Sequence, residues 1–112
     1  MTAPRFTNYT QTISIRSDNP EALVNMLAEW DREQATTDIM GYAGSHLLAD
    51  RENPGMYLIV AEFGVVDPGV SAAEEAERNN DRPETQAWAR KLLEVIDGEP
   101  VYRQYDELYR TG

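Results

Sequence analysis

Few side chains in this sequence could carry out acid–base or metal chemistry near neutral pH. His46 is the only histidine, and there is no cysteine. A lone imidazole can transfer protons, but nothing beside it in sequence orients it, so a hydrogen-bonded or surface histidine is the alternative. The lack of cysteine excludes disulfides and thiolate sites. A metal site would need clustered carboxylates, and the acids of residues 74–81 diverge on a helix, so we predict no metal.

Aromatic side chains form the second group of interest, because they can line a pocket for an aromatic ligand. Trp30 and Trp88 lie on the apolar faces of two expected helices, where core packing also explains them. The tyrosines offer phenol hydroxyls to a ligand, but a sheet surface or a subunit interface would use them equally well. They are Tyr9, Tyr42, Tyr57, Tyr102, Tyr105 and Tyr109.

Arg82 stands in the polar stretch NNDRP, residues 79–83, between two expected helices. Its guanidinium could bind a carboxylate or an enolate oxygen beside a helix N-terminus. The alternative is structural: Asp81 caps the next helix, and Arg82 pairs with an acid of residues 74–77. No Ser-His-Asp arrangement, glycine-rich phosphate loop or nucleotide fingerprint is present, so we expect no cofactor.

The length and charge of the chain exclude further classes of function. Its 112 residues are enough for one domain, 1–112, with its own core. Twenty acidic and ten basic residues give a net charge of −10, and the sequence contains no run of basic residues. We therefore expect neither nucleic-acid nor membrane binding. No apolar run approaches the roughly 20 residues of a membrane span, and no signal segment opens the sequence; we expect a cytoplasmic protein.

Periodicity and capping residues predict the first half of the fold. Residues 8–17 alternate as a strand that places Tyr9, Gln11, Ile13 and Ile15 on one face. A helix follows, with Asn19 as its N-cap and Pro20 as its first residue. Its apolar stripe consists of Leu23, Met26, Leu27 and Trp30.

The second half begins with a strand over residues 40–50, and Pro54-Gly55 turns it into a third strand, so the two form a hairpin. Ser71 and Glu74 have the spacing of a capping box before an acidic helix. A further helix starts at Pro83 and is expected to end at Gly98 as a left-handed cap. Residues 100–110 are expected to form the last strand.

The resulting order is β-α-β-β-α(α)-β, which predicts a ferredoxin-like α+β fold: a four-stranded antiparallel sheet with helices on one face. The third strand, 56–63, is apolar on both faces apart from Glu62. Helices cover one face only, and an uncovered apolar face exceeds what soluble monomers usually expose. A second copy of the chain is the economical cover, so we predict a homodimer through the sheet face.

The length, the element order and the closing stretch NNDRPETQAWARKLLEVIDGEP resemble the antibiotic biosynthesis monooxygenase-like family of dimeric α+β barrels. In that family a helix bearing a tryptophan is followed by a short G-x-P turn and then by the last strand. Trp88 and the Gly-Glu-Pro of residues 98–100 match this pattern here. The resemblance implies two sheets that face each other in a homodimer, with a ligand pocket between sheet and helices in each subunit. Characterised members of the family include cofactor-independent oxygenases of aromatic polyketides and haem-degrading enzymes.

The residues that mark those enzymes match this sequence poorly. The oxygenases tend to have an asparagine one helical turn before the tryptophan, where Glu84 stands here; Asn79 and Asn80 lie before the helix start at Pro83. The haem degraders use a histidine after the tryptophan, which VIDGE lacks, and an asparagine in strand one, where Gln11 stands. These absences argue against haem degradation.

Two functions therefore stay open. One is a cofactor-independent monooxygenase, or a related small enzyme, acting on an aromatic or polyketide-like molecule. The other is a non-catalytic dimeric ligand-binding protein of the same fold, because a fold alone does not decide function. Catalytic residues are left unassigned. The predicted substrate-binding residues are Trp88, Tyr42, His46, Tyr57 and Arg82.

Overall fold

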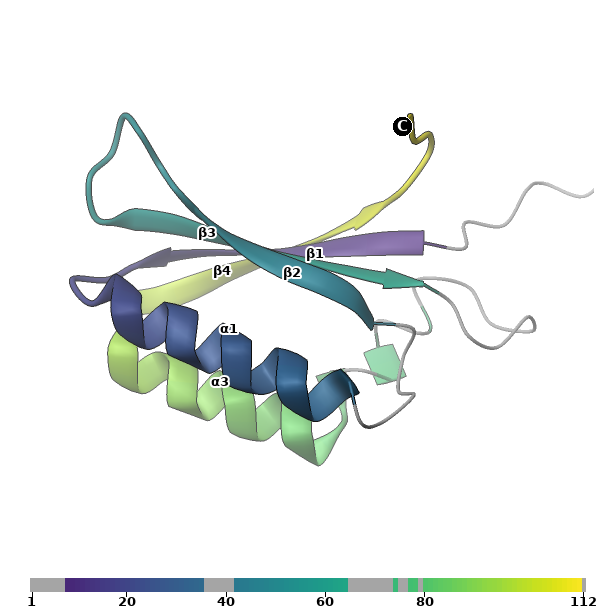
Figure 1. Cartoon of the computed structure of the whole chain (residues 1–112), viewed down its shortest axis with the longest axis horizontal. Coiled ribbons are helices and arrows are strands. Elements are labelled where there is room, and N and C mark those ends of the chain that lie inside the picture. Colours follow the sequence, from purple (N-terminus) through teal and green to yellow (C-terminus); the bar gives the residue numbers. More distant parts are fainter. Residues whose placement is uncertain (1–7, 36–41, 65–73, 75–76, 79, 112) are drawn as a thin grey trace, which may run out of the picture.

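The computed structural model describes residues 8–35, 42–64, 74, 77–78 and 80–111. Its sheet contains β1 (Asn8–Arg16), β2 (Tyr42–Ala49), β3 (Met56–Gly64) and β4 (Asp97–Asp106). The helices α1 (Pro20–Ala35) and α3 (Pro83–Val95) lie on the same face of that sheet (Figure 1). This β-α-β-β-α-β order confirms the predicted ferredoxin-like α+β fold.

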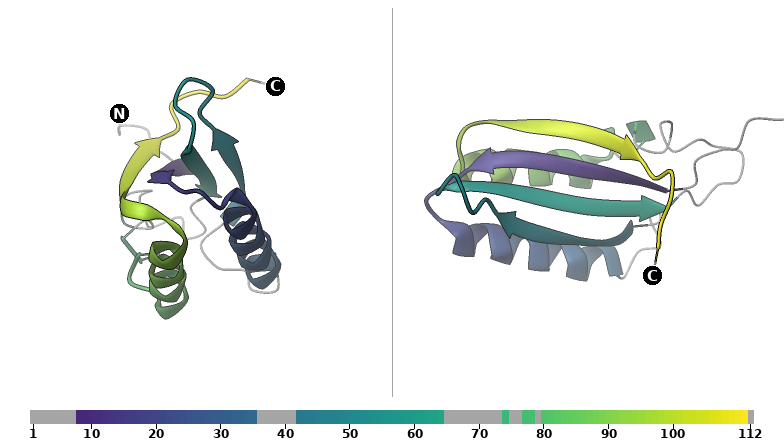
Figure 2. Two further views of the ribbon diagram at one scale, coloured as in Figure 1. Left: turned by 90° about the vertical axis from the view of Figure 1, so that its left-hand side faces the viewer. Right: turned by 90° about the horizontal axis from the view of Figure 1, so that it is seen from above.

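All strand pairs are antiparallel, and the strand order across the sheet is β2-β3-β1-β4 (Figure 2). The two central strands are therefore β1 and β3. β2 and β3 form the predicted hairpin. In the register of the central pair, Ile13 lies opposite Ile59, and Tyr9 opposite Phe63.

The sheet has one covered and one uncovered face. The side chains of β1 and β3 that face the helices form most of the core: Tyr9, Ile13, Ile15, Ile59, Ala61 and Phe63 are buried. Successive residues of a strand point to opposite sides, so the alternate positions face away from the helices. We call this second side the open face. Its apolar side chains are Leu48, Met56, Leu58, Val60, Val101 and Tyr105.

The helix α1 begins where its sequence predicts. The Asn19 side-chain oxygen accepts a hydrogen bond from the Ala22 backbone N–H at 3.3 Å, and Pro20 is the first helical residue. Leu23 is buried, and Met26 and Leu27 pack against the core. None of the helices in the described part of the chain is long and apolar enough to cross a membrane.

The helix α3 begins at Pro83 as predicted, but its N-cap and its C-terminal end differ from the prediction. Its N-cap residue is Arg82 rather than Asp81, and no side chain caps it. The helix ends at Val95 because Ile96 adopts an extended backbone and packs against the core. Gly98 does have a positive φ of 75°, but it lies inside β4, which begins three residues earlier than expected.

The expected acidic helix from residue 71 lies largely outside the described residues. The positions described there, Glu74, Glu77, Arg78 and Asn80, are helical. The chain then turns at Asp81, whose backbone N–H donates to the Glu77 carbonyl at 3.2 Å. This turn brings Asn80 to the beginning of α3.

Ser17 joins three parts of the fold at one buried position. Its hydroxyl donates to the Val95 carbonyl at 2.7 Å, at the end of α3, and accepts from the Asn19 backbone N–H at 3.0 Å, at the start of α1. Its own backbone N–H donates to the Gly55 carbonyl at 3.0 Å, in the turn between β2 and β3. Ser17 thereby fixes both helix ends against the sheet.

We expect Ser17→Ala to lower the free energy of unfolding by about 1–3 kcal/mol, because it leaves two backbone groups without their partner. Urea unfolding measured by circular dichroism tests this, with Ser14→Ala on the open face as the matched control. Equal losses in the two variants would contradict the assigned role of Ser17.

Candidate functional site

A pocket lies between the helices and the covered face of the sheet. Its inner cavity has a volume of about 50 Å³ and receives side chains from all four strands and from both helices. An outer cleft of about 420 Å³ extends from it along α3 and β4. The two spaces share the side chains of Gln11, Ile13, Asn80, Thr85, Trp88 and Gln104, so they form one site.

Aromatic side chains line the inner cavity on two sides. On the sheet side, the rings of Tyr9 and Phe63 stack with centroids 5.0 Å apart and planes 10° apart. On the helix side, Trp30 of α1 meets Trp88 of α3 with centroids 6.1 Å apart and planes tilted by 56°. Flat apolar walls of this kind suit the edge of an aromatic ligand that enters from the outer cleft, since the inner cavity of about 50 Å³ is smaller than a whole ring.

The polar groups of the pocket are uncharged. Gln11 and Gln104 are direct partners in the register of β1 and β4, and both line the inner cavity and the outer cleft. Asn80 adds a third amide to both spaces, and Gln86 adds one to the outer cleft. Thr85 and Trp88 are three residues apart on α3 and therefore share a face of that helix. No charged side chain is among the described residues that line either space.

Two of these polar groups are buried without a hydrogen-bond partner. Within the described part of the chain, this applies to Thr85 Oγ1 and Trp88 Nε1 in the pocket, and also to Arg82 Nη1 at the start of α3. Each such group costs about 1–3 kcal/mol, and native proteins contain few of them. Because Thr85 and Trp88 both line the pocket, their unpaired donors are candidates for contact with a ligand that rearranges this lining.

Of the five predicted substrate-binding residues, Trp88 lines the pocket. His46 is exposed and lies on the open face, because its neighbour Ser45 lines the inner cavity. Tyr57 is half-buried and packs against the core without lining the pocket. Arg82 immediately precedes α3 and pairs with Glu84 at 3.4 Å. The side chain of Tyr42 lies outside the described residues.

The predicted set did not include the polar residues that the inner cavity and the outer cleft share, which are Gln11, Asn80, Thr85 and Gln104. Gln11 could have been identified as a pocket residue from the sequence, since it is the one amide on the otherwise apolar face of β1. Thr85 likewise falls on the helix face of Trp88. The position of Gln104 depends on the register between β1 and β4, and that of Asn80 depends on the turn at Asp81, neither of which the sequence specifies.

Titratable groups around the site add little charge to it. Partial burial raises the pKa of Tyr102, which lines the outer cleft, so its phenol stays neutral at neutral pH. Among the described residues, no three His, Asp or Glu side chains lie close enough together to hold a metal ion.

Comparison with known proteins gives relatives in structure but not in sequence. No family model matches the chain, and no curated protein matches it either. A "putative antibiotic biosynthesis monooxygenase" from Nitrosomonas europaea superposes with a TM-score of 0.66 over 100% of both chains at 14% identity. A Caulobacter crescentus protein of the same description gives a TM-score of 0.67 over 94% of both chains at 10% identity.

A third similar structure is a variant of SnoaB, a cofactor-independent oxygenase from Streptomyces nogalater. Its TM-score is 0.67 at 14% identity, over 93% of this chain and 96% of SnoaB. At such low identities the likeness concerns the fold. It confirms the ferredoxin-like fold of the single chain.

Proposed function

We propose that the protein is a cofactor-independent monooxygenase of the antibiotic biosynthesis monooxygenase-like family, acting on an aromatic or polyketide-like small molecule, in the cytoplasm. The observation that carries this proposal is the pocket itself, whose two aromatic walls surround uncharged hydrogen-bonding groups. Support also comes from the shared fold of SnoaB, which is an oxygenase.

The chemistry of such a pocket starts with a substrate that loses a proton easily. An aromatic ketone with an activated CH₂ group gives an electron-rich anion that reacts directly with O₂. The carbon gains one oxygen atom as a ketone, and the other oxygen leaves as water with the two hydrogens, so R₂CH₂ and O₂ give R₂CO and H₂O. Hydrogen-bond donors that stabilise the anion lower the barrier to its formation.

The composition of the lining restricts the substrate further. The described side chains around the pocket include no carboxylate and no imidazole to act as a strong base. A substrate that is acidic by itself suits this lining, and the protein contributes hydrogen-bond donors and orientation. A readily enolised aryl ketone meets this requirement.

Oxygen uptake with anthrone, an aryl ketone with one activated CH₂ group, tests the proposed activity. We expect protein dialysed against a chelator to consume one O₂ per anthrone at a rate above that of buffer and of heat-denatured protein. Trp88→Phe should reduce this rate, because it removes the indole donor but keeps an aromatic wall. Binding of anthrone without oxygen uptake would instead favour the non-catalytic ligand-binding protein.

A homodimer is the second part of the proposal, and the open face supports it. Leu48, Val101 and Tyr105 on that face are 46%, 50% and 49% exposed. In Figure 1 the turn between β2 and β3 and the C-terminal segment both rise on this side of the sheet, at its two ends. A second copy seated between them would cover the apolar face that the helices leave bare.

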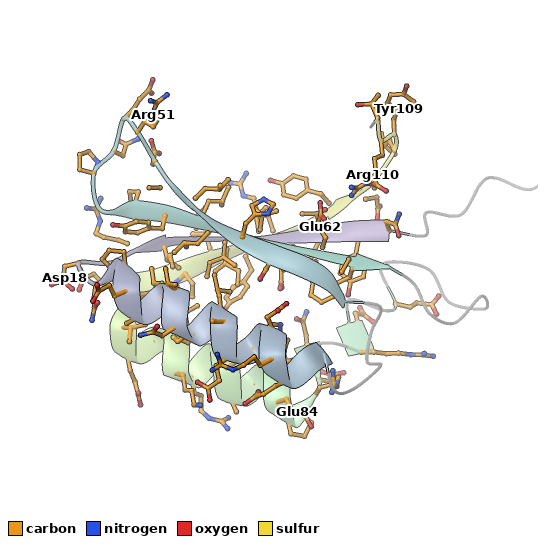
Figure 3. All side chains as sticks on the ribbon, in the orientation of Figure 1. Asp18, Arg51, Glu62, Glu84, Tyr109 and Arg110 are labelled. Carbon is orange, nitrogen blue, oxygen red and sulfur yellow. The ribbon has the colours of Figure 1, made fainter. Side chains whose placement is uncertain are left out.

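Glu62, the one charged residue of β3, is compatible with such an interface. It faces the open side near the C-terminal segment, where Arg110 pairs with it at 3.3 Å (Figure 3). Arg110 also contacts Glu107, and the Asn8 amide donates to Glu107 at 2.8 Å. These contacts lower the pKa of Glu107, Asn8 contributing most, so the cluster stays paired at neutral pH.

A further inference from the structure

We infer that Thr85 and Trp88 form a two-donor site that binds one oxygen atom of the ligand, and that Thr85 thereby selects aromatic ligands carrying a phenol, enol or ketone oxygen. This inference rests on the pocket of the proposed function and adds to it a residue with an assigned contact. It does not depend on whether the bound ligand is oxidised.

The burial of the two donors is the first argument. The Thr85 hydroxyl and the Trp88 indole N–H are both buried, and neither has a hydrogen-bond partner in the described part of the chain. A threonine hydroxyl on a helix commonly bonds to a carbonyl of the preceding turn, which Thr85 does not do. Two neighbouring donors without an acceptor leave room for an acceptor from outside the chain.

The placement of the two donors is the second argument. They lie three residues apart on α3, so their side chains project from one face of the helix. Both line the inner cavity and the outer cleft, where the two spaces join. Glu84, one helical turn before Trp88, takes no part, because it pairs with Arg82 and its side chain is 54% exposed. Thr85 is thus the polar side chain of α3 that accompanies Trp88 in the inner cavity.

The chemistry of the donors defines the ligand. An indole N–H only donates, and a hydroxyl can rotate to donate, so together they fit an oxygen with two free lone pairs. Phenol, enol and ketone oxygens on an aromatic ring meet this description, and the corresponding anions meet it better because hydrogen bonds to charged groups are stronger. The side-chain carbonyl of Gln11 or Gln104 can accept the hydroxyl proton of a neutral phenol.

The matched probes are 1-naphthol and naphthalene, which differ by a single oxygen. We expect Thr85→Val to weaken 1-naphthol binding about tenfold and to leave naphthalene binding unchanged, because valine keeps the shape of threonine without its donor. Thr85→Ser retains the hydroxyl and should bind 1-naphthol within about twofold of the wild-type protein. Dissociation constants from NMR titration give all six values.

The melting temperature separates a binding role from a structural one. Because Thr85 Oγ1 lacks a partner, its replacement by valine removes an unsatisfied buried group and should leave the melting temperature of the ligand-free protein unchanged or raised. A lowered melting temperature in Thr85→Val but not in Thr85→Ser would show that the hydroxyl serves the fold, which would overturn the inference.

Equal effects of Thr85→Val on the two probes, or no effect on either, would also overturn it. The proposed function is tested separately, by oxygen uptake with anthrone. Oxygen uptake with anthrone that is insensitive to Thr85→Val would retain the activity and reject the donor pair. Selective loss of 1-naphthol binding, in a protein that consumes no oxygen, would retain the donor pair and reject the activity.

Discussion

Replacement of Leu58 by aspartate is expected to halve the particle mass, from a dimer of two 12.7 kDa chains to a single chain. Leu58 lies on the open face in the central strand β3, between Ser14 of β1 and Leu48 of β2. A carboxylate buried there by a second copy would have no partner, and the cost of removing an unpaired charge from water is several kcal/mol. Size-exclusion chromatography with light scattering measures the mass.

Val24→Asp is the matched control for this experiment. Val24 is 54% exposed on α1, away from the open face, so the same change of chemistry there should leave the dimer intact. A wild-type particle of 12.7 kDa at micromolar concentration would contradict the proposed dimer. A Leu58→Asp particle that remains dimeric would contradict the open face as its interface.

Leu92→Ala is expected to lower the free energy of unfolding by about 3–5 kcal/mol, a large part of the stability of a domain of this size. Leu92 is 0% exposed and belongs to the central cluster with Ile13, Ile15, Leu23 and Ile59. Its truncation leaves a cavity among side chains that two helices and the sheet hold in place. The melting temperature should fall by roughly 10–20 °C.

The neighbouring Leu93 provides the control, because it is 54% exposed on the other side of the same helix. Leu93→Ala removes the same atoms and has the same effect on helix propensity, yet it should change the free energy of unfolding by no more than about 0.5 kcal/mol. Similar losses in the two variants would contradict the assigned orientation of α3 and, with it, the position of Trp88.

The fold was largely predictable because periodicity records which face of an element is buried. The alternation of residues 8–17 identified the covered face of β1, and the helical spacing of Leu23, Met26 and Leu27 identified that of α1. The end of α3 was mispredicted because Gly98 has the backbone conformation of a cap but serves in β4. Packing of Ile96 against the core ends the helix earlier.

The candidate site was less predictable, because it depends on which elements become neighbours. Trp88 was chosen through its resemblance to a family pattern, and the pocket contains it. His46 was chosen for its chemistry, but strand alternation places it on the open face. Gln104 reaches the pocket through pairing with Gln11 across two strands that are distant in sequence. Such pairing follows from the assembled sheet rather than from a local pattern.

If the pocket beneath α3 binds an oxygenated aromatic molecule through Trp88, the indole N–H resonance of Trp88 should respond to that ligand. The chain contains two tryptophans, so its NMR spectrum should show two such signals, which Trp88→Phe assigns. We expect 1-naphthol to move the Trp88 signal downfield, because a new hydrogen bond deshields the donated proton. Saturation with 1-naphthol that leaves the Trp88 signal in place, while signals from the open face shift, would contradict the account.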